Sequence, residues 1–365
     1  MQADTSFDER KPAAQAAADA AVYGLPARWY HERAIYAAER RQIFARDWQL
    51  VCAESDIRAP GDYVATDVAG YRFFVIRDRD GLLRAYHNVC PHRASTLLDA
   101  GQGHCDLLRC RYHGWVFDSA GNLRRAPDFG EAAWFRKEDH GLKAIRVESW
   151  RGLVFVNFDC AAAPLAQALG SLPETVKDYP IESFTKIRQV EFEMNCNWKT
   201  YTDNFVEGYH IPGIHPSFHD VIDFSKFETT HAEALVIMTA PQKSGSIYGG
   251  MWLWGWPNYT LSVYPTGMNC SRIVPLDEKR TRLVYSFFFK DASESARVAN
   301  EATIETNCAI VREDFGICEH AQGNLEGGIF RRGPLSPKHE AGVRYFHDEV
   351  RRALGREGIV EREWL

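Results

Sequence analysis

Two short segments of the chain each place a cysteine close to a histidine, and this pattern constrains the fold more than any other feature. The segments are NVCPHRAS at 88–95 and LRCRYHGW at 108–115. Thiolate and imidazole groups are the ligands that soft and borderline metals prefer. Pro91 in the first segment and Gly114 in the second favour tight loops. We therefore expect the two loops to converge on one metal centre.

Two kinds of metal centre fit these spacings. One is a structural zinc site, although zinc fingers usually pair cysteine with cysteine and histidine with histidine. The other is a two-iron, two-sulfur cluster in which one iron takes two cysteines and the other takes two histidines. Each loop here mixes one cysteine with one histidine, which favours the cluster.

The mixed spacing and the aromatic run YHGWVF at 112–117 resemble those of the Rieske proteins. The resemblance implies that each loop gives its cysteine to one iron and its histidine to the other. The four cluster ligands implied are Cys90, His92, Cys110 and His113. Neutral imidazoles in place of thiolates raise the reduction potential of such a cluster.

The composition excludes several classes of protein. A net charge of −6 argues against a surface for nucleic acid or anionic lipid. The sequence contains no run of eighteen apolar residues, so no membrane span is predicted. The N-terminal stretch lacks the pattern of a secretion signal. The nine cysteines are an odd number and do not suggest a disulfide framework. We expect a cytoplasmic protein.

The hydrophobic pattern along the chain changes several times. Helical texture is predicted at 12–46, 195–215, 294–326 and about 338–355, with short β-prone runs at 47–160 and 230–290. This order predicts an α+β protein with an antiparallel β module near its N-terminus. The expected domains are an N-terminal helical segment at 1–46, a cluster-binding module at 47–160 and a catalytic domain at 161–365.

A second group of metal-ligating side chains lies in the segment NCNWKTYTDNFVEGYHIPGIHP at 195–216. His210 and His215 flank Pro212 and Gly213, which we expect to break a helix between them. Two imidazoles and one carboxylate form the facial triad of non-haem Fe(II) oxygenases, which leaves positions open for O2. Candidate carboxylates are Asp203 and Glu207 nearby, and the Glu313–Asp314 pair of the segment REDFGICEHAQGNL.

With both groups present, almost the whole chain resembles the catalytic α subunit of Rieske non-haem iron oxygenases, in the ring-hydroxylating dioxygenase superfamily. The resemblance implies a helix-grip (START-like) catalytic domain with a central antiparallel sheet. It also implies one Rieske [2Fe-2S] cluster and one mononuclear Fe(II) per subunit. The resemblance further implies that Asp314 is the third iron ligand, with Glu313 as the adjacent alternative, and that Asn204 lies near the iron.

The resemblance gives Glu207 a separate role. Glu207 precedes His210 by three residues, about one helical turn, so it can hold the ring nitrogen that does not bind iron. In the family, the acid at this place carries electrons from the cluster histidine of a neighbouring subunit, here His113. Many members have aspartate there, and glutamate is associated with members that act on quaternary ammonium compounds.

The sequence leaves the substrate open. Trp252, Trp254 and Trp256 alternate in MWLWGWPN, so on a strand they would share one face. They could line a pocket for an aromatic ring, form a cage for a trimethylammonium group, or belong to the ordinary core. Monooxygenation, dioxygenation and oxidative demethylation all remain possible outcomes.

Partners follow from what the chain lacks. It contains no nucleotide-binding glycine motif and no all-cysteine ferredoxin run. Electrons must therefore come from a separate NAD(P)H-dependent reductase or ferredoxin, and O2 and a small molecule are the substrates. The electron route needs a neighbouring subunit, which predicts a homotrimer. The competing hypotheses are a zinc-stabilised binding protein and a bare Rieske electron carrier.

Overall fold

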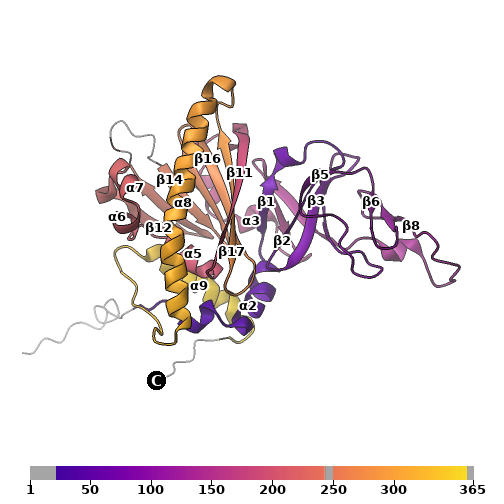
Figure 1. Ribbon diagram of the computed structural model, residues 1–365, viewed down its shortest axis with the longest axis horizontal. Coiled ribbons are helices and arrows are strands. Elements are labelled where there is room, and N and C mark those ends of the chain that lie inside the picture. Colours follow the sequence, from indigo (N-terminus) through magenta and orange to yellow (C-terminus); the bar gives the residue numbers. More distant parts are fainter. Residues whose placement is uncertain (1–21, 242, 244–249, 360–365) are drawn as a thin grey trace, which may run out of the picture.

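The computed structural model describes residues 22–241, 243 and 250–359. The part of the predicted N-terminal helix at 12–21 lies outside them. Within these residues the chain forms two large antiparallel sheets, a small third sheet and helices that pack mainly on the second sheet (Figure 1). The predicted α+β class is confirmed, and each large sheet is built from one part of the chain, 49–157 for the first and 185–289 for the second.

The first sheet has the strand order β1-β10-β9-β4-β3-β2-β5. Its strands are β1 (Gln49–Ala53), β2 (Asp62–Val68), β3 (Tyr71–Arg77), β4 (Leu83–His87), β5 (Gly101–His104), β9 (Ala144–Trp150) and β10 (Leu153–Asn157). The small sheet consists of β6 (Leu108–Arg109), β7 (Val116–Phe117) and β8 (Leu123–Arg125). Both lie between the boundaries 47 and 160 expected for the cluster-binding module.

The second sheet has the order β11-β17-β16-β15-β14-β13-β12. Its strands are β11 (Thr185–Met194), β12 (Glu228–Ala232), β13 (Leu235–Ala240), β14 (Gly250–Gly255), β15 (Tyr259–Tyr264), β16 (Gly267–Pro275) and β17 (Thr281–Phe289). Side chains alternate between its faces: Met251 and Leu253 join one buried cluster, whereas Trp254 joins another.

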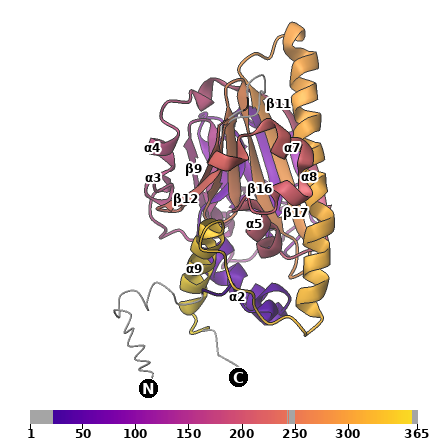
Figure 2. The same cartoon turned by 90° about the vertical axis from the view of Figure 1, so that its left-hand side faces the viewer.

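The α-helices are α2 (Arg33–Glu39), α3 (Leu165–Ala168), α4 (Leu172–Thr175), α5 (Trp198–Phe205), α6 (Ile211–Ile214), α7 (Pro216–Val221), α8 (Arg297–Glu326) and α9 (Ala341–Gly355). Figure 2 shows α8 on one side of the second sheet and α3 with α4 on the other. Among the described helices, none has both the length and the hydrophobicity of a membrane-spanning segment.

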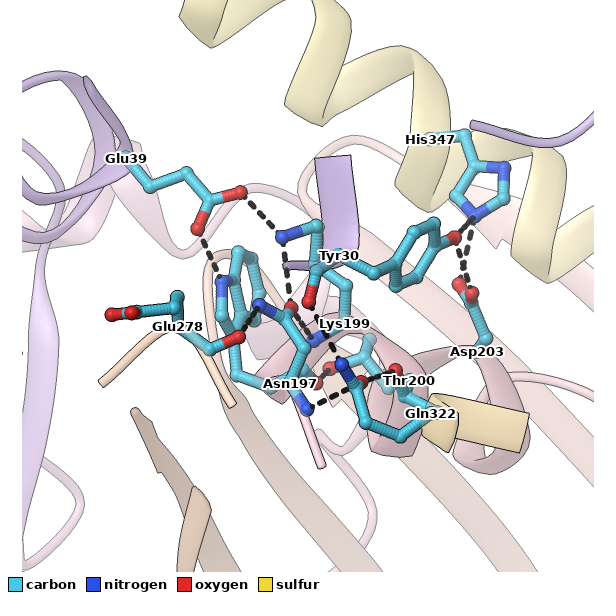
Figure 3. A network of polar contacts seen from close by, with 11 residues as sticks. Tyr30, Glu39, Asn197, Lys199, Thr200, Asp203, Glu278, Gln322 and His347 are labelled. Atoms are coloured by element: carbon cyan, nitrogen blue, oxygen red, sulfur yellow. Dashed lines mark hydrogen bonds and ion pairs between the residues drawn. The ribbon is translucent and has the colours of Figure 1, made fainter. Parts of the chain in front are cut away.

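A buried polar network fixes α5 between the N-terminal segment and α8 (Figure 3). Lys199 and Glu39 form an ion pair of 2.5 Å in which both side chains are fully buried. The Asn197 side chain caps α5 by accepting the Lys199 backbone N–H at 2.9 Å. Gln322 of α8 accepts the Asn197 backbone N–H at 3.0 Å. Breaking such a buried ion pair would leave an uncompensated charge, so the network ties α5 to the N-terminal segment and to α8.

One hydrophobic core joins the two large sheets. The same buried cluster contains Phe73 and Val75 of β3 and Val284 and Phe287 of β17. A shared core of this kind resists relative motion, because opening it would expose apolar surface to water. The β6-β7-β8 sheet nevertheless extends far from α6 and α7, which lie at the opposite end of the long axis (Figure 1).

Candidate active site and cluster-binding loops

The two Cys/His loops have the same backbone design. In the first, Cys90 N–H donates to Ser95 O at 2.8 Å and Ala94 N–H donates to Cys90 O at 3.0 Å. In the second, the equivalent bonds join Cys110 to Trp115 at 2.8 Å and Gly114 to Cys110 at 3.0 Å. Each loop turns through a residue with positive φ, 57° at Ala94 and 71° at Gly114. Glycine adopts this conformation without strain.

The four cysteine and histidine side chains of these loops come together in space. Cys90 and Cys110 are buried, and both are free thiols. The rings of His92 and His113 lie 4.5 Å apart, nearer the surface. The His92 ring stacks on Trp115 with a centroid separation of 4.8 Å. Thiols inside and imidazoles outside are a donor set that fits a [2Fe-2S] centre with two cysteine and two histidine ligands.

The second predicted group also comes together. One ligand atom from each of His210, His215 and Asp314 lies within 4.8 Å of the others. His215 Nε2 lies 2.9 Å and His210 Nε2 lies 3.7 Å from Asp314 Oδ1. Asp314 projects from α8, whereas the histidines lie at the two ends of α6.

The donor atoms of His210, His215 and Asp314 are better suited to binding one metal ion than to hydrogen bonding with one another. Asp314 is only 6% exposed, and its Oδ1 has no hydrogen-bond partner among the described residues despite the nearby imidazoles. Burial acts to lower the pKa of His215, but the carboxylates of Asp314 and Glu313 outweigh it and hold that pKa above its usual value. A buried site with unused lone pairs and a preference for positive charge is suited to a divalent cation.

Carboxylates hold the other nitrogens of both histidines. His210 Nδ1 lies 2.5 Å from Glu207 Oε1, and His215 Nδ1 lies 2.7 Å from Glu313 Oε2. Such contacts fix the ring orientation and leave each Nε2 available to a metal. Glu313 therefore stands behind His215 and not at the converging ligand atoms, where the structure places Asp314.

The expected helix break at Pro212 is wrong in its details. Helix α5 ends at Phe205, before the histidines, and Pro212 lies in the first turn of α6. Proline is accommodated there because the first turn needs no backbone N–H donor. The short α6 itself separates His210 from His215 and orients both toward Asp314.

A cavity of about 110 Å³ opens at this group. Asn204 and Glu207 line it on one side, and a second recess of about 450 Å³ beyond them contains Asp203, Glu340 and His347. Asp203 is therefore not among the gathered ligand atoms; it accepts a hydrogen bond from Tyr30 at 2.6 Å. Asn204 lines the same cavity as His210, His215 and Asp314, and its position near the iron stays a prediction.

The expectation that three tryptophans share one role is wrong. Trp252 lines the cavity, in ring contact with Phe218 at 5.4 Å. Trp254 is fully buried and packs against Phe346 of α9 at 5.2 Å. Trp256 lies beyond the end of β14 and packs against the same core. Helix α9 covers this part of the sheet, so alternation alone does not bring a residue to the cavity.

Several cavity residues carry no local signal in the sequence. They come from separate elements and meet only through the sheet register and the position of α8. These residues are Tyr201, Ser262, Asn269, Tyr285 and Asn307.

Replacement of Glu313 by alanine is expected to weaken Fe(II) binding by about 10- to 100-fold, as is typical for loss of a partner behind a metal-binding histidine. The reason is that His215 Nδ1 loses its acceptor. Titration of the iron-depleted protein with Fe(II) measures the effect. The matched control is Glu305→Ala, since Glu305 lies on the same helix but pairs with Arg188 at 3.0 Å. Equal iron affinity in both variants would contradict the positioning role.

Comparison with known proteins agrees with this architecture. Residues 47–145 match the Rieske [2Fe-2S] domain. Residues 181–254 and 238–356 match the ring hydroxylating alpha subunit (catalytic domain). Choline monooxygenase of Amaranthus tricolor is 29% identical over 93% of this chain and 78% of its own length. The carnitine monooxygenase oxygenase subunit of Escherichia coli (strain K12) is 28% identical over 90% of this chain and 92% of its own.

Solved structures extend the agreement to three dimensions. The quaternary ammonium Rieske monooxygenase CntA with an inhibitor aligns with a TM-score of 0.85 and 27% identity, over 94% of this chain and 99% of its own. Naphthalene 1,2-dioxygenase with indole, at 21% identity and a TM-score of 0.77 over 91% of this chain and 92% of its own, shares the fold. The hypotheses of a zinc-stabilised binding protein and of a bare electron carrier are therefore not retained. The chain belongs to the Rieske non-haem iron oxygenases, as a catalytic α subunit with one [2Fe-2S] cluster and one mononuclear iron.

Proposed function

We propose that the protein is the terminal oxygenase of a multicomponent system and acts on a small quaternary ammonium compound. The observation that carries this proposal is the lining of the cavity beside His210, His215 and Asp314. Aromatic rings contribute much of it, and none of its described lining residues is a lysine or arginine.

The aromatic rings are arranged to receive a cation. Trp252 contacts Phe218 at 5.4 Å and stacks with Phe227 at 6.4 Å, and all three line the cavity. Aromatic faces attract a quaternary ammonium group through their quadrupoles. An aromatic acid would instead bring a carboxylate that needs a cationic partner when it is desolvated. The lining therefore favours the ammonium class over the aromatic-acid class.

The proposed roles of the residues follow from their positions. Cys90, His92, Cys110 and His113 hold the cluster in their paired loops. His210, His215 and Asp314 hold the mononuclear iron, whose chemistry is the activation of O2. Glu207 and Glu313 keep the imidazole rings in place. The aromatic wall places the substrate's cation next to the triad, so that a carbon bonded to nitrogen is available for hydroxylation.

Electron delivery requires more than one subunit in this proposal. The second cluster loop follows β6, and the triad histidines flank α6. These two elements lie at opposite ends of the molecule's long axis (Figure 1), and the shared core opposes their approach. Glu207 contacts His210 on one side and lines the second recess on the other. We assign it the link from His210 to His113 of a neighbouring subunit, most simply in a homotrimer. An NAD(P)H-dependent flavin or iron–sulfur reductase, or a ferredoxin, supplies the electrons.

The cysteines bear on the cellular compartment in which the protein acts. None of the nine cysteines forms a disulfide; Cys90 and Cys110 hold the cluster in this proposal, and the other seven are free thiols. Free thiols persist in a reducing compartment. This supports the cytoplasm as the site of action.

Reductase-coupled O2 uptake with NADH tests the substrate class. A panel of trimethylammonium compounds and aromatic acids is compared, and each product is identified to separate true turnover from uncoupled O2 reduction. Turnover is expected with ammonium compounds alone, and Trp252→Leu is expected to raise KM with little change in iron content. Turnover of aromatic acids without turnover of ammonium compounds would overturn the proposal.

A further inference from the structure

The floor of the cavity is a row of four residues on neighbouring strands. The strand register pairs Met238 with Trp252, Trp252 with Ser262, and Ser262 with Asn269. All four line the cavity. The row therefore runs from an apolar and aromatic end on β13 and β14 to a neutral polar end on β15 and β16.

A chain of hydrogen bonds sets the orientation of the amide at the polar end. Thr303 O belongs to the backbone of α8 and can only accept, and Asn307 Nδ2 donates to it at 2.8 Å. Asn307 Oδ1 then faces Asn269, whose Nδ2 donates to it at 3.3 Å. A flipped Asn269 amide would bring two acceptor oxygens together, so the bond to Thr303 also determines which Asn269 atom is left over.

The atom left over is an acceptor. Asn269 is 2% exposed, and its Oδ1 has no hydrogen-bond partner among the described residues. A buried acceptor without a partner is costly, and a ligand that donates a hydrogen bond relieves the cost. A ligand carboxylate at the same place would bring its acceptor oxygen against the acceptor Oδ1 of Asn269, which is unfavourable in a buried site.

We propose that Asn269 is a specificity-determining residue and that the substrate is a quaternary ammonium compound bearing a hydroxyl group. This inference rests on the proposed function. A quaternary nitrogen carries no hydrogen, so the donor must be another group of the same molecule. The hydroxyl donates to Asn269 Oδ1 while the cation lies against Trp252. Both contacts come from the row of four residues that forms the cavity floor.

Three probes separate this inference from the function on which it rests. Choline carries the cation and a hydroxyl donor, its O-methyl ether carries the same cation with an acceptor only, and trimethylglycine carries a carboxylate. Calorimetric dissociation constants are measured on the iron-containing oxygenase without reductase. The wild-type protein is expected to bind choline about tenfold more tightly than the ether, and trimethylglycine more weakly than either.

Two variants locate the effect. Asn269→Leu removes the acceptor and is expected to make the affinities for choline and the ether equal. Asn307→Ala frees the Asn269 amide to flip, which should also reduce the preference for choline. Binding of the ether serves as an internal control, because it needs the same aromatic contacts. A variant that no longer binds the ether has lost the cavity itself. In that case the affinities of the wild-type protein for choline and for the ether decide whether the inference holds.

The outcomes are distinct. Equal wild-type affinity for choline and the ether would mean that a water molecule serves Asn269, and the inference would fail while the proposed function stood. A preference for trimethylglycine would also overturn the inference alone. Binding of aromatic acids without binding of any ammonium probe would overturn both.

Discussion

Asp314→Ala is expected to abolish substrate-coupled O2 consumption while the absorption spectrum of the [2Fe-2S] cluster stays unchanged. Loss of a partner behind a ligand already weakens a metal site about 10- to 100-fold, and loss of a ligand should exceed this. Asp314 provides the buried oxygen that faces both imidazoles, 2.9 Å from His215 Nε2 and 3.7 Å from His210 Nε2. No other carboxylate oxygen joins this group within the described residues.

The measurements are iron content per cluster, the visible spectrum and turnover. Far-UV circular dichroism shows whether α8 still folds. Glu313→Ala is the informative comparison because the two acids are adjacent and exchange roles in the rival assignment. We expect partial loss of iron affinity in Glu313→Ala and complete loss of function in Asp314→Ala. The reverse order would transfer the ligand role to Glu313.

Glu207→Gln is expected to retain both metals but to slow oxidation of the reduced cluster by about a hundredfold, the cost typical of a slightly misplaced reacting pair. Glu207 Oε1 holds His210 Nδ1 at 2.5 Å, and Oε2 accepts the backbone N–H of Tyr209 and of His210. Glutamine keeps one acceptor oxygen and replaces the other with an NH2 donor. This disturbs the contact with His210 Nδ1, through which Glu207 would pass the electron.

Stopped-flow mixing of the reduced protein with substrate and O2 measures this rate directly. Glu340→Gln is the matched control, because Glu340 lines the same recess but bonds to the Ser336 backbone N–H instead of to an imidazole. We expect a near-normal rate in that variant. Unchanged cluster oxidation in Glu207→Gln would remove the bridge role and leave the rest of the proposal intact.

The sequence predicted the elements with strong local patterns. Helix α8 lies close to the predicted helix at 294–326, and the strands β3, β10, β15 and β17 lie within the predicted β-prone stretches, because hydrophobic periodicity and turn residues act over short ranges. Local reasoning failed between Phe205 and His215, where proline begins a short helix instead of ending a long one. The preference of proline for the first turn makes both outcomes compatible with the same letters.

The cavity lining could not be predicted for a different reason. Asn269 and Asn307 are 38 residues apart and meet through the register of β16 and the placement of α8. Trp254 alternates correctly with Trp252 yet belongs to the core, because α9 covers it. Both facts depend on the packing of complete elements, about which a short stretch of sequence carries no information.

The core shared by the two large sheets has a consequence for the enzyme as an assembly. A carrier that swings between partners can work as a single chain, but a chain whose two metal sites are held apart by packed side chains cannot shorten its own electron path. Under the proposed function, catalysis is then a property of the oligomer. Dilution that dissociates the subunits should silence each one reversibly, although every subunit remains folded and retains its metals.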